Sequence, residues 1–290
     1  MITPLAILKK MFLGGTWFVG IRDYTKCDAQ SYMNIEVSKG QWIADPFIVE
    51  NDGRHYLFCE QYFNEKQKAS IGCFEIVDGK AINNHIIIET SYHMSYPCVF
   101  SYNGTFYMIP ESSANKTIDL YKADNFPYKW SHHKVLHEGD RFVDTTVFIS
   151  DGEYYLLSYV KVSKGWDLVV FSLKMDMLTI EEICRYHYNT NIGRPAGFLY
   201  KAKKLIRPAQ DCHKKYGESI ILYSVEFKLG ENYREEKIGE LKSDNINFPF
   251  KIDRIHTINR DDKYEVIDVF KDEIDLFHGL RIIKRAYFTH

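Results

Sequence analysis

The sequence lacks the features that mark several common functional classes. Its 290 residues carry a formal net charge of -2 and a pI of about 6.6, so there is no basic excess for a nucleic-acid surface. It holds no apolar run of about 18 residues, so no integral membrane segment is expected. Gly-rich phosphate loops and the Walker, GxSxG and HExxH motifs are also absent. We therefore predict neither a cofactor nor a metal.

Paired cysteines are missing as well. None of the six cysteines belongs to a CxxC motif, which argues against a zinc ribbon or a thioredoxin-type site. The N-terminal segment is not a typical signal peptide, because Lys9 and Lys10 interrupt its apolar run. These observations predict a reducing, cytoplasmic location. Residues 4–13 either pack on the domain or form a short amphipathic helix in peripheral contact with a membrane.

Aromatic and apolar residues are abundant by contrast. The chain has 21 Tyr and 19 Phe and is 45% hydrophobic, which excludes disorder by composition. Tyr and Phe are common in β-sheets, and their rings also stack on sugar faces. A β-rich domain with a large core is therefore expected, and its aromatic content is compatible with sugar binding.

A hairpin pattern recurs along the chain. An apolar strand, an Asp-Gly or Asn-Gly turn and an aromatic-rich strand occupy residues 45–60, 96–111 and 144–159. These dipeptides favour tight hairpins because type I′ turns need positive φ at both central residues. Weaker copies lie at residues 194–209 and 265–280. The repeat therefore occurs five times, at a period of about 50 residues.

The repeat predicts an all-β fold, a five-bladed β-propeller of four-stranded antiparallel blades. Each hairpin is followed by a third β-rich run and, in several copies, by a fourth, more polar one. An N-terminal strand at residues 16–22 is expected to close the last blade beside residues 278–288, which hides two sheet edges. No linker divides the chain, so residues 1–290 are predicted to form one domain, with 1–14 as an N-terminal extension.

Charged residues recur at equal distances from the turns. Counting back from each turn places Asp45, Tyr96, Asp144 and Arg194 at one level of the channel. Counting forward places Glu60 and Glu111 at the far end of the partner strands. Because the two ends of a hairpin lie side by side, both sets should meet at one mouth of the channel. Four acids facing an arginine are a candidate site, since like charges at close range are costly.

Carboxylates at such a mouth suit glycosidic-bond chemistry. Two of them about 5 to 10 Å apart act as base or nucleophile and as proton donor. We assign Asp45 as base or nucleophile, Asp144 as modulator and orienter, and Glu111 or Glu60 as the acid. Arg194 and Arg207 are candidates to clamp an anionic group, because a guanidinium binds two oxygens at once. The remaining substrate-binding candidates are Tyr96, Gln210, Asp211 and His278.

Ordinary structural roles are the alternatives for these residues. Asp45 and Asp144 stand at strand entrances, where Asp often caps backbone N–H groups. Glu60 and Glu111 could pair with arginines, and Arg207 could pair with Asp211. His132 and His133 are adjacent, so in a strand they point to opposite faces and are not expected to share a metal.

The segments "WIADPF", "RFVDTTVF", "GRPAGFLY" and "LIRPAQDC" together carry a resemblance to a known family. They resemble the N-terminal propeller domain of plant glucosamine inositolphosphorylceramide transferases, which also occurs in bacterial proteins linked to surface-polysaccharide synthesis. The resemblance spans roughly residues 15 to 285. The plant proteins also carry a separate transferase domain, and no such domain is expected within these 290 residues.

A more distant resemblance is to the five-bladed propellers of glycoside hydrolase families 43, 32 and 68. It implies that Asp45 matches the blade-one base and Asp144 the blade-three residue that tunes the acid. The blade-four acid of family 43 has no counterpart here, because "GRPAG" places Arg194 in that region. This difference argues against plain hydrolysis.

Three functions remain open at this point. The first is glycosyl transfer in cell-surface polysaccharide or glycolipid synthesis, with a sugar, nucleotide-sugar or sugar phosphate as partner. The second is a glycoside hydrolase or phosphorylase that uses the same acids. The third is a non-catalytic glycan-binding propeller, since fold alone does not define function.

Overall fold

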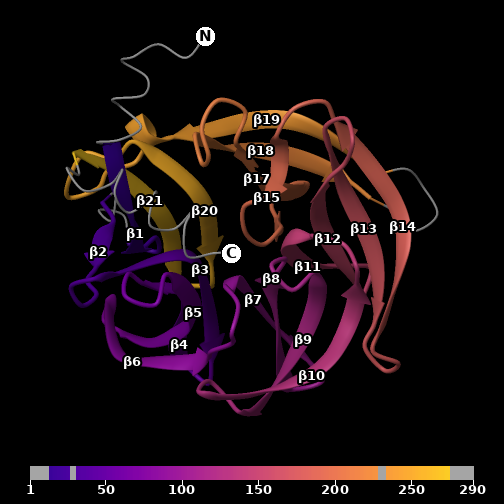
Figure 1. Ribbon diagram of the computed structural model, residues 1–290, viewed down its shortest axis with the longest axis horizontal. Helices are drawn as coiled ribbons and strands as arrows, with labels where there is room; N and C mark the ends of the chain where they lie inside the picture. The colour runs from indigo at the N-terminus through magenta and orange to yellow at the C-terminus, as the bar shows by residue number, and fades with distance from the viewer. Residues whose placement is uncertain (1–12, 27–30, 228–232, 275–290) are drawn as a thin grey trace.

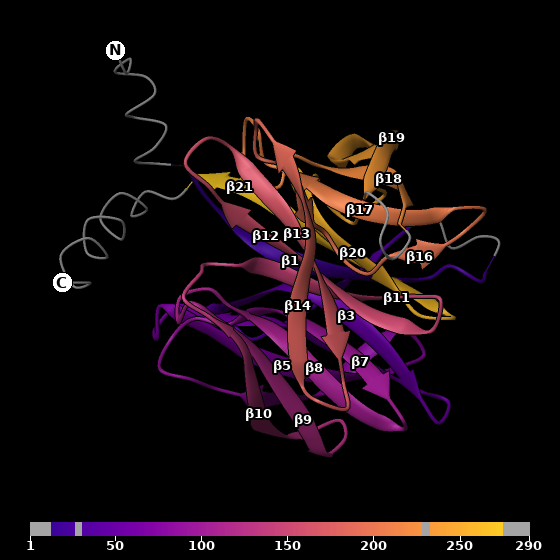
Figure 2. The ribbon, with the colours of Figure 1, turned by 90° about the vertical axis from the view of Figure 1, so that its right-hand side faces the viewer.

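The computed structural model describes residues 13–26, 31–227 and 233–274 and is almost entirely β. Its strands form five antiparallel sheets, arranged as blades around a central channel (Figure 1). Seen from the side, many of the strands run obliquely between the two faces of the ring (Figure 2). The five-bladed propeller and its four-stranded blades are therefore confirmed.

The first three blades follow one another along the chain, with the innermost strand first. Blade one contains β3 (Gln41–Asn51), β4 (Arg54–Phe63), β5 (Lys68–Val77) and β6 (Lys80–Ile88). Blade two contains β7 (Ser95–Tyr102), β8 (Thr105–Ser112), β9 (Thr117–Asn125) and β10 (Lys129–Glu138). Blade three contains β11 (Val143–Ser150), β12 (Glu153–Lys161), β13 (Trp166–Lys174) and β14 (Thr179–Tyr188).

Blade four is less regular. It contains β15 (Ile192–Pro195), β17 (Leu205–Asp211), β18 (Ser219–Glu226) and β19 (Arg234–Lys242), with the short β16 (Tyr200–Lys201) also paired to β17. A 3₁₀ turn, η1 (Ser243–Asn245), follows. The inner strand is split because residues 196–199 leave the sheet. This is the copy of the hairpin that has Lys201-Ala202 where the first three have Asp-Gly or Asn-Gly.

Blade five joins the two ends of the chain. Its strands from the inside outward are β20 (Arg254–Arg260), β21 (Tyr264–Ile274), β1 (Leu13–Asp23) and β2 (Met33–Ile35). The N-terminal strand closes the blade as predicted, but it pairs with β21, from Leu13↔Ile274 to Asp23↔Tyr264. The partner expected at residues 278–288 lies outside the described residues. The fifth hairpin is thus β20–β21, one strand earlier than the predicted 265–280, and residues 261–263 connect its two strands in place of a two-residue Asp-Gly or Asn-Gly turn.

The inner strands share an irregularity at the level of the predicted site. Asp45, Tyr96 and Asp144 have φ of 50°, 47° and 50°, and the ladder shifts register at each of them. A bulge of this kind re-aims a side chain at a cost in local strain. Blade five has the same shift between Ile255 and Ile258. The recurrent level inferred from turn spacing is therefore a ring of bulges.

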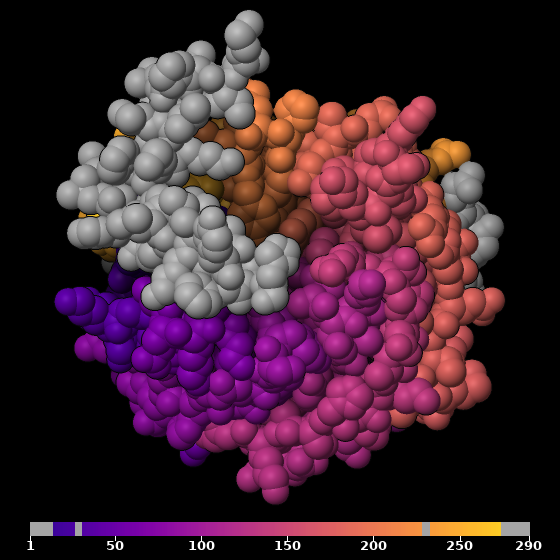
Figure 3. All heavy atoms as spheres, viewed as in Figure 1, coloured from indigo at the N-terminus to yellow at the C-terminus, as the bar shows by residue number. Residues whose placement is uncertain are grey.

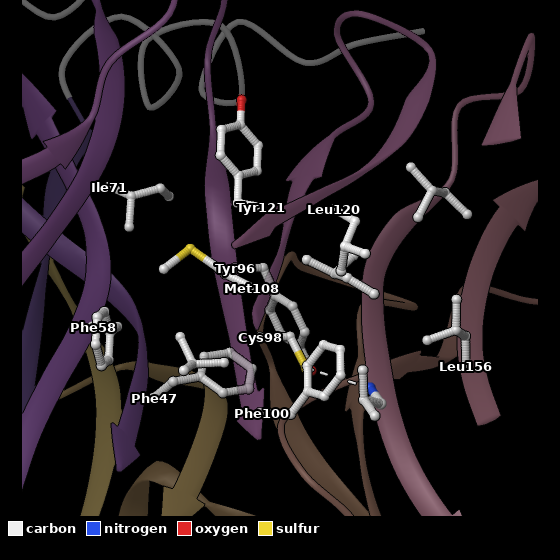
Figure 4. Close-up of a cluster of buried hydrophobic side chains, with 14 of the residues drawn as sticks. Phe47, Phe58, Ile71, Tyr96, Cys98, Phe100, Met108, Leu120, Tyr121 and Leu156 are labelled. Carbon is white, nitrogen blue, oxygen red and sulfur yellow. Dashed lines mark hydrogen bonds between the residues drawn. The ribbon is translucent and has the colours of Figure 1, made fainter. Parts of the chain in front are cut away.

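The largest core cluster joins blades one, two and three. Phe47 and Phe58 from blade one face Tyr96, Cys98 and Met108 from blade two (Figure 4). All five of these side chains are fully buried. Burying one such side chain contributes roughly 1.5–3 kcal/mol, so the blade-to-blade contacts hold the mouth residues in place.

Five described cysteines are free, and four of them are buried. Within the described ranges, no helix has both the length and the apolar character to span a bilayer.

Candidate functional site

The predicted residues meet at the mouth where the inner strands begin. Glu60 lies opposite Ala44, and Glu111 lies opposite Ser95, so each glutamate is adjacent to the bulge of its own blade. Figure 3 views this face, with a recess near the centre of the ring. The convergence of Asp45, Glu60, Glu111 and Asp144 follows from the equal length of the hairpins.

Asp144 anchors a cluster on the side of blades two to four. Arg194 donates to it from Nε and, at 2.9 Å, from Nη2 to Oδ1. Gln210 adds a hydrogen bond of 2.7 Å to Oδ2. Glu111 accepts from Arg194 Nη2 at 3.1 Å and from Ser113 Oγ at 2.7 Å. Both oxygens of Asp144 are thus occupied, whereas Nη1 of Arg194 has no partner among the described residues.

Asp45 belongs to a second cluster, in which blade five supplies most of the partners. His256 Nδ1 lies 2.6 Å from Asp268, and its Nε2 lies 3.5 Å from Asp45 Oδ1. Thr257 donates to the same oxygen of Asp45 at 3.0 Å. The backbone N–H of Asp45 donates to Asp268 at 2.8 Å. Oδ2 of Asp45 accepts no hydrogen bond within the described part of the chain, and it is the oxygen left for a ligand.

Two aromatic residues enclose this cluster and link it to the first. Trp17 stacks on His256 with ring centroids 4.0 Å apart. Tyr216 contacts His256 edge-on at 5.1 Å and lies 5.5 Å from the guanidinium of Arg194. Asp45 and Arg194 therefore lie on two sides of one small group of rings.

Burial dominates the electrostatics of both clusters. It raises the pKa of Asp45 to about 8, although the charge of His256 opposes the shift. It also raises the pKa of Asp144 to about 7 against the opposing charge of Arg194. Burial alone would lower the pKa of His256, but Asp268 and Asp45 outweigh it and raise this pKa to about 9. Proton-exchanging groups with pKa values close to neutrality are typical of functional sites.

Glu60 forms a third part of the mouth with a histidine. His93 Nε2 lies 3.1 Å from Glu60 Oε1, and His93 Nδ1 accepts from the backbone N–H of Ala69. This arrangement assigns the proton to Nε2, which donates to Glu60. Nearby, Trp42 stacks on Tyr62 at 4.6 Å, and the Trp42 side chain is only partly buried.

Three of the other predicted residues lie elsewhere or outside the described chain. Tyr96 is fully buried and bonds Thr146 and the N–H of Gly197. Asp211 caps a turn by accepting from the N–H of His213. His278 lies outside the described residues. The hydroxyl of Tyr96 is therefore already used between blades, and Asp211 has a local structural role.

Arg207 requires a correction. Its side chain is 0% exposed and pairs with Glu235 at 2.7 Å, not with Asp211. It also donates to the carbonyl of Gly193 and to the hydroxyl of Tyr188. With its donors engaged inside blade four, Arg207 has no free edge with which to clamp an anion.

Sequence reasoning missed His256, Thr257, Asp268, Trp17, Tyr216 and His93. The first three lie on the hairpin that was assigned one strand too late. Aligning "RIHTINR" with the inner strands of the other blades would have placed His256 at the level of Asp45. No sequence signal marks Trp17, which reaches the site only because β1 closes blade five.

Asp45, His256 and Asp268 carry ligand atoms within 4.8 Å of one another, a spacing that could hold a metal ion. His256 and Thr257 already bind these carboxylates directly. We therefore describe the group as a hydrogen-bonded cluster. A similar group of His55, Asp261 and Asp262 lies at the turns of blades one and five.

Comparison with known proteins places this geometry in a family. Residues 24–261 match the family model described as the N-terminal part of glucosamine inositolphosphorylceramide transferase 1. The chain belongs to this family. It is 31% identical over 209 residues to the transferase of that name from Arabidopsis thaliana and 28% identical over 210 residues to the one from Oryza sativa subsp. japonica. Each match covers 68% of this chain but only 27% and 28% of the relatives, so the chain spans about a quarter of their length.

Solved structures extend the likeness at the level of the fold. An α-L-arabinofuranosidase from Podospora anserina in complex with cellotriose matches 79% of this chain and 90% of its own, with a TM-score of 0.59 and 14% identity. A thermostable family-43 glycoside hydrolase matches 82% and 91%, with a TM-score of 0.57 and 15% identity. The propeller of this family is therefore built like those of glycoside hydrolases.

Proposed function

We propose that this protein is a carbohydrate-active enzyme that performs a glycosyl-transfer step in the synthesis of a cell-surface polysaccharide or glycolipid. Its family and its propeller neighbours support a role in sugar chemistry. The observation that carries the proposal is that one mouth holds two polar atoms that are available to hydrogen-bond a ligand. Asp45 keeps Oδ2, and Arg194 keeps Nη1, without a partner in the described chain.

In this proposal Asp45 moves the proton. A pKa of about 8 lets it exchange a proton near neutral pH, the property that general acid–base catalysis requires. It accepts the proton of an acceptor hydroxyl while that oxygen bonds to the anomeric carbon. The leaving group departs with the electrons of the broken bond. His256, held by Asp268, positions Asp45 for this step.

The other residues bind and orient. Arg194 donates from Nη1 to an oxygen of the substrate, and Asp144 with Gln210 holds its guanidinium in place. Between the two candidate acids, Glu60 is better suited to protonate a leaving group. Glu111 contacts Arg194 and Ser113, whereas the side chain of Glu60 pairs with His93 alone among the described residues. Trp42 offers a partly open ring face on which a sugar can stack.

Two alternatives use the same mouth. A hydrolase or phosphorylase is favoured by the hydrolase-like propeller, but Arg194 occupies the blade-four region where family 43 is expected to carry its acid. A glycan-binding role without turnover is favoured by the mutual neutralisation of Asp144, Glu111 and Arg194. In both cases the sugar contacts Asp45 and Trp42.

The first experiment separates these functions by ligand. Thermal unfolding is measured with a panel of nucleotide-sugars, sugar phosphates and neutral oligosaccharides, because a ligand of the folded state raises apparent stability. A shift with a nucleotide-sugar or sugar phosphate supports transfer. A shift with neutral oligosaccharides alone supports the hydrolase or binding function, and overnight incubation then distinguishes turnover from binding.

The second experiment tests Asp45 with the ligand found. Loss of a proton-transferring group typically costs 10²–10⁴-fold in rate, so Asp45→Asn should lower kcat by about that factor without loss of the fold. Asp151→Asn, in an exposed turn at the opposite end of blade three, is the matched control. Full activity of both Asp45→Asn and Asp144→Asn would overturn the proposal.

The cytoplasmic location stays a prediction. It is supported by the buried, unpaired Cys59, Cys73 and Cys98. Fractionation of producing cells, with blotting for the chain, checks it.

A further inference from the structure

A basic pocket lies on the rim beside the candidate site. Lys116, Arg141 and Lys161 line it together with Gly139, Asp140, Val160 and Val162. Its walls come from the β8–β9 turn, the β10–β11 connection and the end of β12. The β8–β9 turn follows Glu111 along the chain, and the β10–β11 connection precedes Asp144, so the pocket lies at the same end of blades two and three as the carboxylate cluster.

The charge of this pocket is not balanced by its own residues. Lys116, Arg141 and Lys161 are all exposed, and none forms an ion pair with a carboxylate of the described residues. Asp140 is the acid among the lining residues, and its Oδ2 is held by His137 Nε2 at 2.9 Å. Lys161 also lies 5.9 Å from the ring of Trp166. Three cations around one open pocket favour a ligand that carries several negative oxygens.

Arg194 and Arg207, the two arginines predicted from the sequence to bind an anion, supply little uncompensated positive charge. Arg207 is buried against Glu235, and most of the charge of Arg194 is compensated by Asp144 and Glu111. Among the described residues, Lys116, Arg141 and Lys161 on the rim are therefore cations beside this mouth whose charge no carboxylate compensates.

We propose that Lys116, Arg141 and Lys161 bind the phosphate or diphosphate of a phosphorylated glycosyl substrate whose sugar lies at the channel mouth. The inference rests on the proposed function for its sugar half, but the phosphate site is defined by the pocket alone. The sugar side of the mouth carries Trp42 and Asp45, and the phosphate side lies across the ring at blades two and three. The substrate is thus oriented with its anionic end outward.

The test measures binding of inorganic pyrophosphate to the full chain by calorimetry. In the double variant Arg141→Ala/Lys161→Ala the dissociation constant should rise at least about tenfold, because charge-assisted hydrogen bonds are lost. The salt dependence of binding should weaken as well. Lys39→Ala, an exposed lysine at the mouth of blade one, is the matched control and should bind as wild type does.

Two competitors identify the source of the phosphate. Uridine diphosphate stands for a soluble donor, and phosphatidylinositol vesicles, compared with phosphatidylcholine vesicles, stand for a lipid headgroup. Displacement of pyrophosphate by either supports the pocket and names the source. Absence of pyrophosphate binding, or equal binding in the double variant and wild type, overturns the inference.

Asp45→Asn separates this inference from the proposed function. It should lower kcat by about 10²–10⁴-fold and still bind pyrophosphate as wild type does. If the pocket variants bind pyrophosphate with the dissociation constant of wild type while Asp45→Asn is inactive, the phosphate site is wrong and the proposed function stands. If the pocket variants lose pyrophosphate binding while Asp45→Asn stays active, the phosphate site is supported and the proposed function is wrong.

Discussion

At the scale of single residues, the site is defined by which polar atoms are already satisfied. Asp144 has both oxygens occupied, and Arg207 has its donors occupied, so neither is free for a ligand. Within the described chain, Asp45 and Arg194 each keep one polar atom without a hydrogen-bond partner. The same residue types at equivalent levels of the propeller therefore have different roles, and hydrogen-bond saturation distinguishes them.

Replacing Asp45 should change the pH dependence of stability. Its pKa is raised from 3.8 to about 8, so the folded state holds its proton more tightly than the unfolded state. The associated stability is fully present below about pH 4 and is lost as pH rises to about 8. Asp45→Asn removes this loss. The free energy of unfolding of the variant minus that of wild type should therefore be larger at pH 9 than at pH 5, by on the order of a few kcal/mol.

Urea unfolding of both proteins at the two pH values measures this difference. Asp151→Asn serves again as control, because its side chain lies in an exposed turn. A difference between Asp45→Asn and wild type that is the same at both pH values would contradict the raised pKa.

Replacing Arg207 should affect folding and not ligand binding. Arg207→Met leaves Glu235 without its partner, with a side chain that is 1% exposed. Breaking a buried pair in this way costs about 3–5 kcal/mol. Chemical denaturation measures the loss, and Arg207→Met/Glu235→Leu should recover part of it.

An exposed ion pair supplies the control for this experiment. Arg185 pairs with Glu182 at the surface, and Arg185→Met should cost only about 0–1 kcal/mol. If Arg207→Met is as mild as Arg185→Met, the buried role assigned to Arg207 is wrong.

At the scale of elements, the bulged inner strands both aim the site residues and connect the blades. The bulge of blade two carries Tyr96, whose hydroxyl reaches Thr146 in blade three and the N–H of Gly197 beyond β15. Bulges at equivalent positions therefore have different roles. Those of blades one and three present carboxylates, and that of blade two fills the channel with a ring.

Tyr96→Phe tests this connecting role. It removes the hydroxyl and leaves the buried N–H of Gly197 without its partner, at a cost of about 1–3 kcal/mol. Tyr154→Phe is the matched control, because its hydroxyl donates to the carbonyl of Ser101 in an exposed hydrogen bond. Thermal unfolding of both variants measures the costs. A loss no larger in Tyr96→Phe than in Tyr154→Phe would argue against the connecting role.

At the scale of the whole molecule, blade five closes the ring with strands from both ends of the chain. β1 covers β21 along eleven residue pairs, from Leu13↔Ile274 to Asp23↔Tyr264. It also delivers Trp17 to the stack on His256. The strand that closes the ring therefore also completes the site.

A chain that starts at Gln41 should lose this closure. It lacks β1 and β2, so the fully buried Ile267 and Val269 of β21 become exposed along with an open sheet edge. We expect aggregation or a much lower melting temperature. A synthetic peptide of residues 13–37, added during refolding, should restore soluble monomer on size exclusion, and a scrambled peptide should not. An unchanged melting temperature without the peptide would contradict the role of β1.

Local sequence alone determined the blades and much of the mouth. Asp-Gly and Asn-Gly turns set hairpins of equal length, and equal length places Asp45, Asp144, Glu60 and Glu111 at one end of the channel. Only the tertiary structure decided the partners of these residues. Asp45 meets Asp268 across 223 positions because the ring closes there, and Arg207 is withdrawn from the site because Glu235, on another strand, neutralises it. A turn is determined by residues adjacent in the sequence, whereas these contacts depend on how five blades pack around one axis.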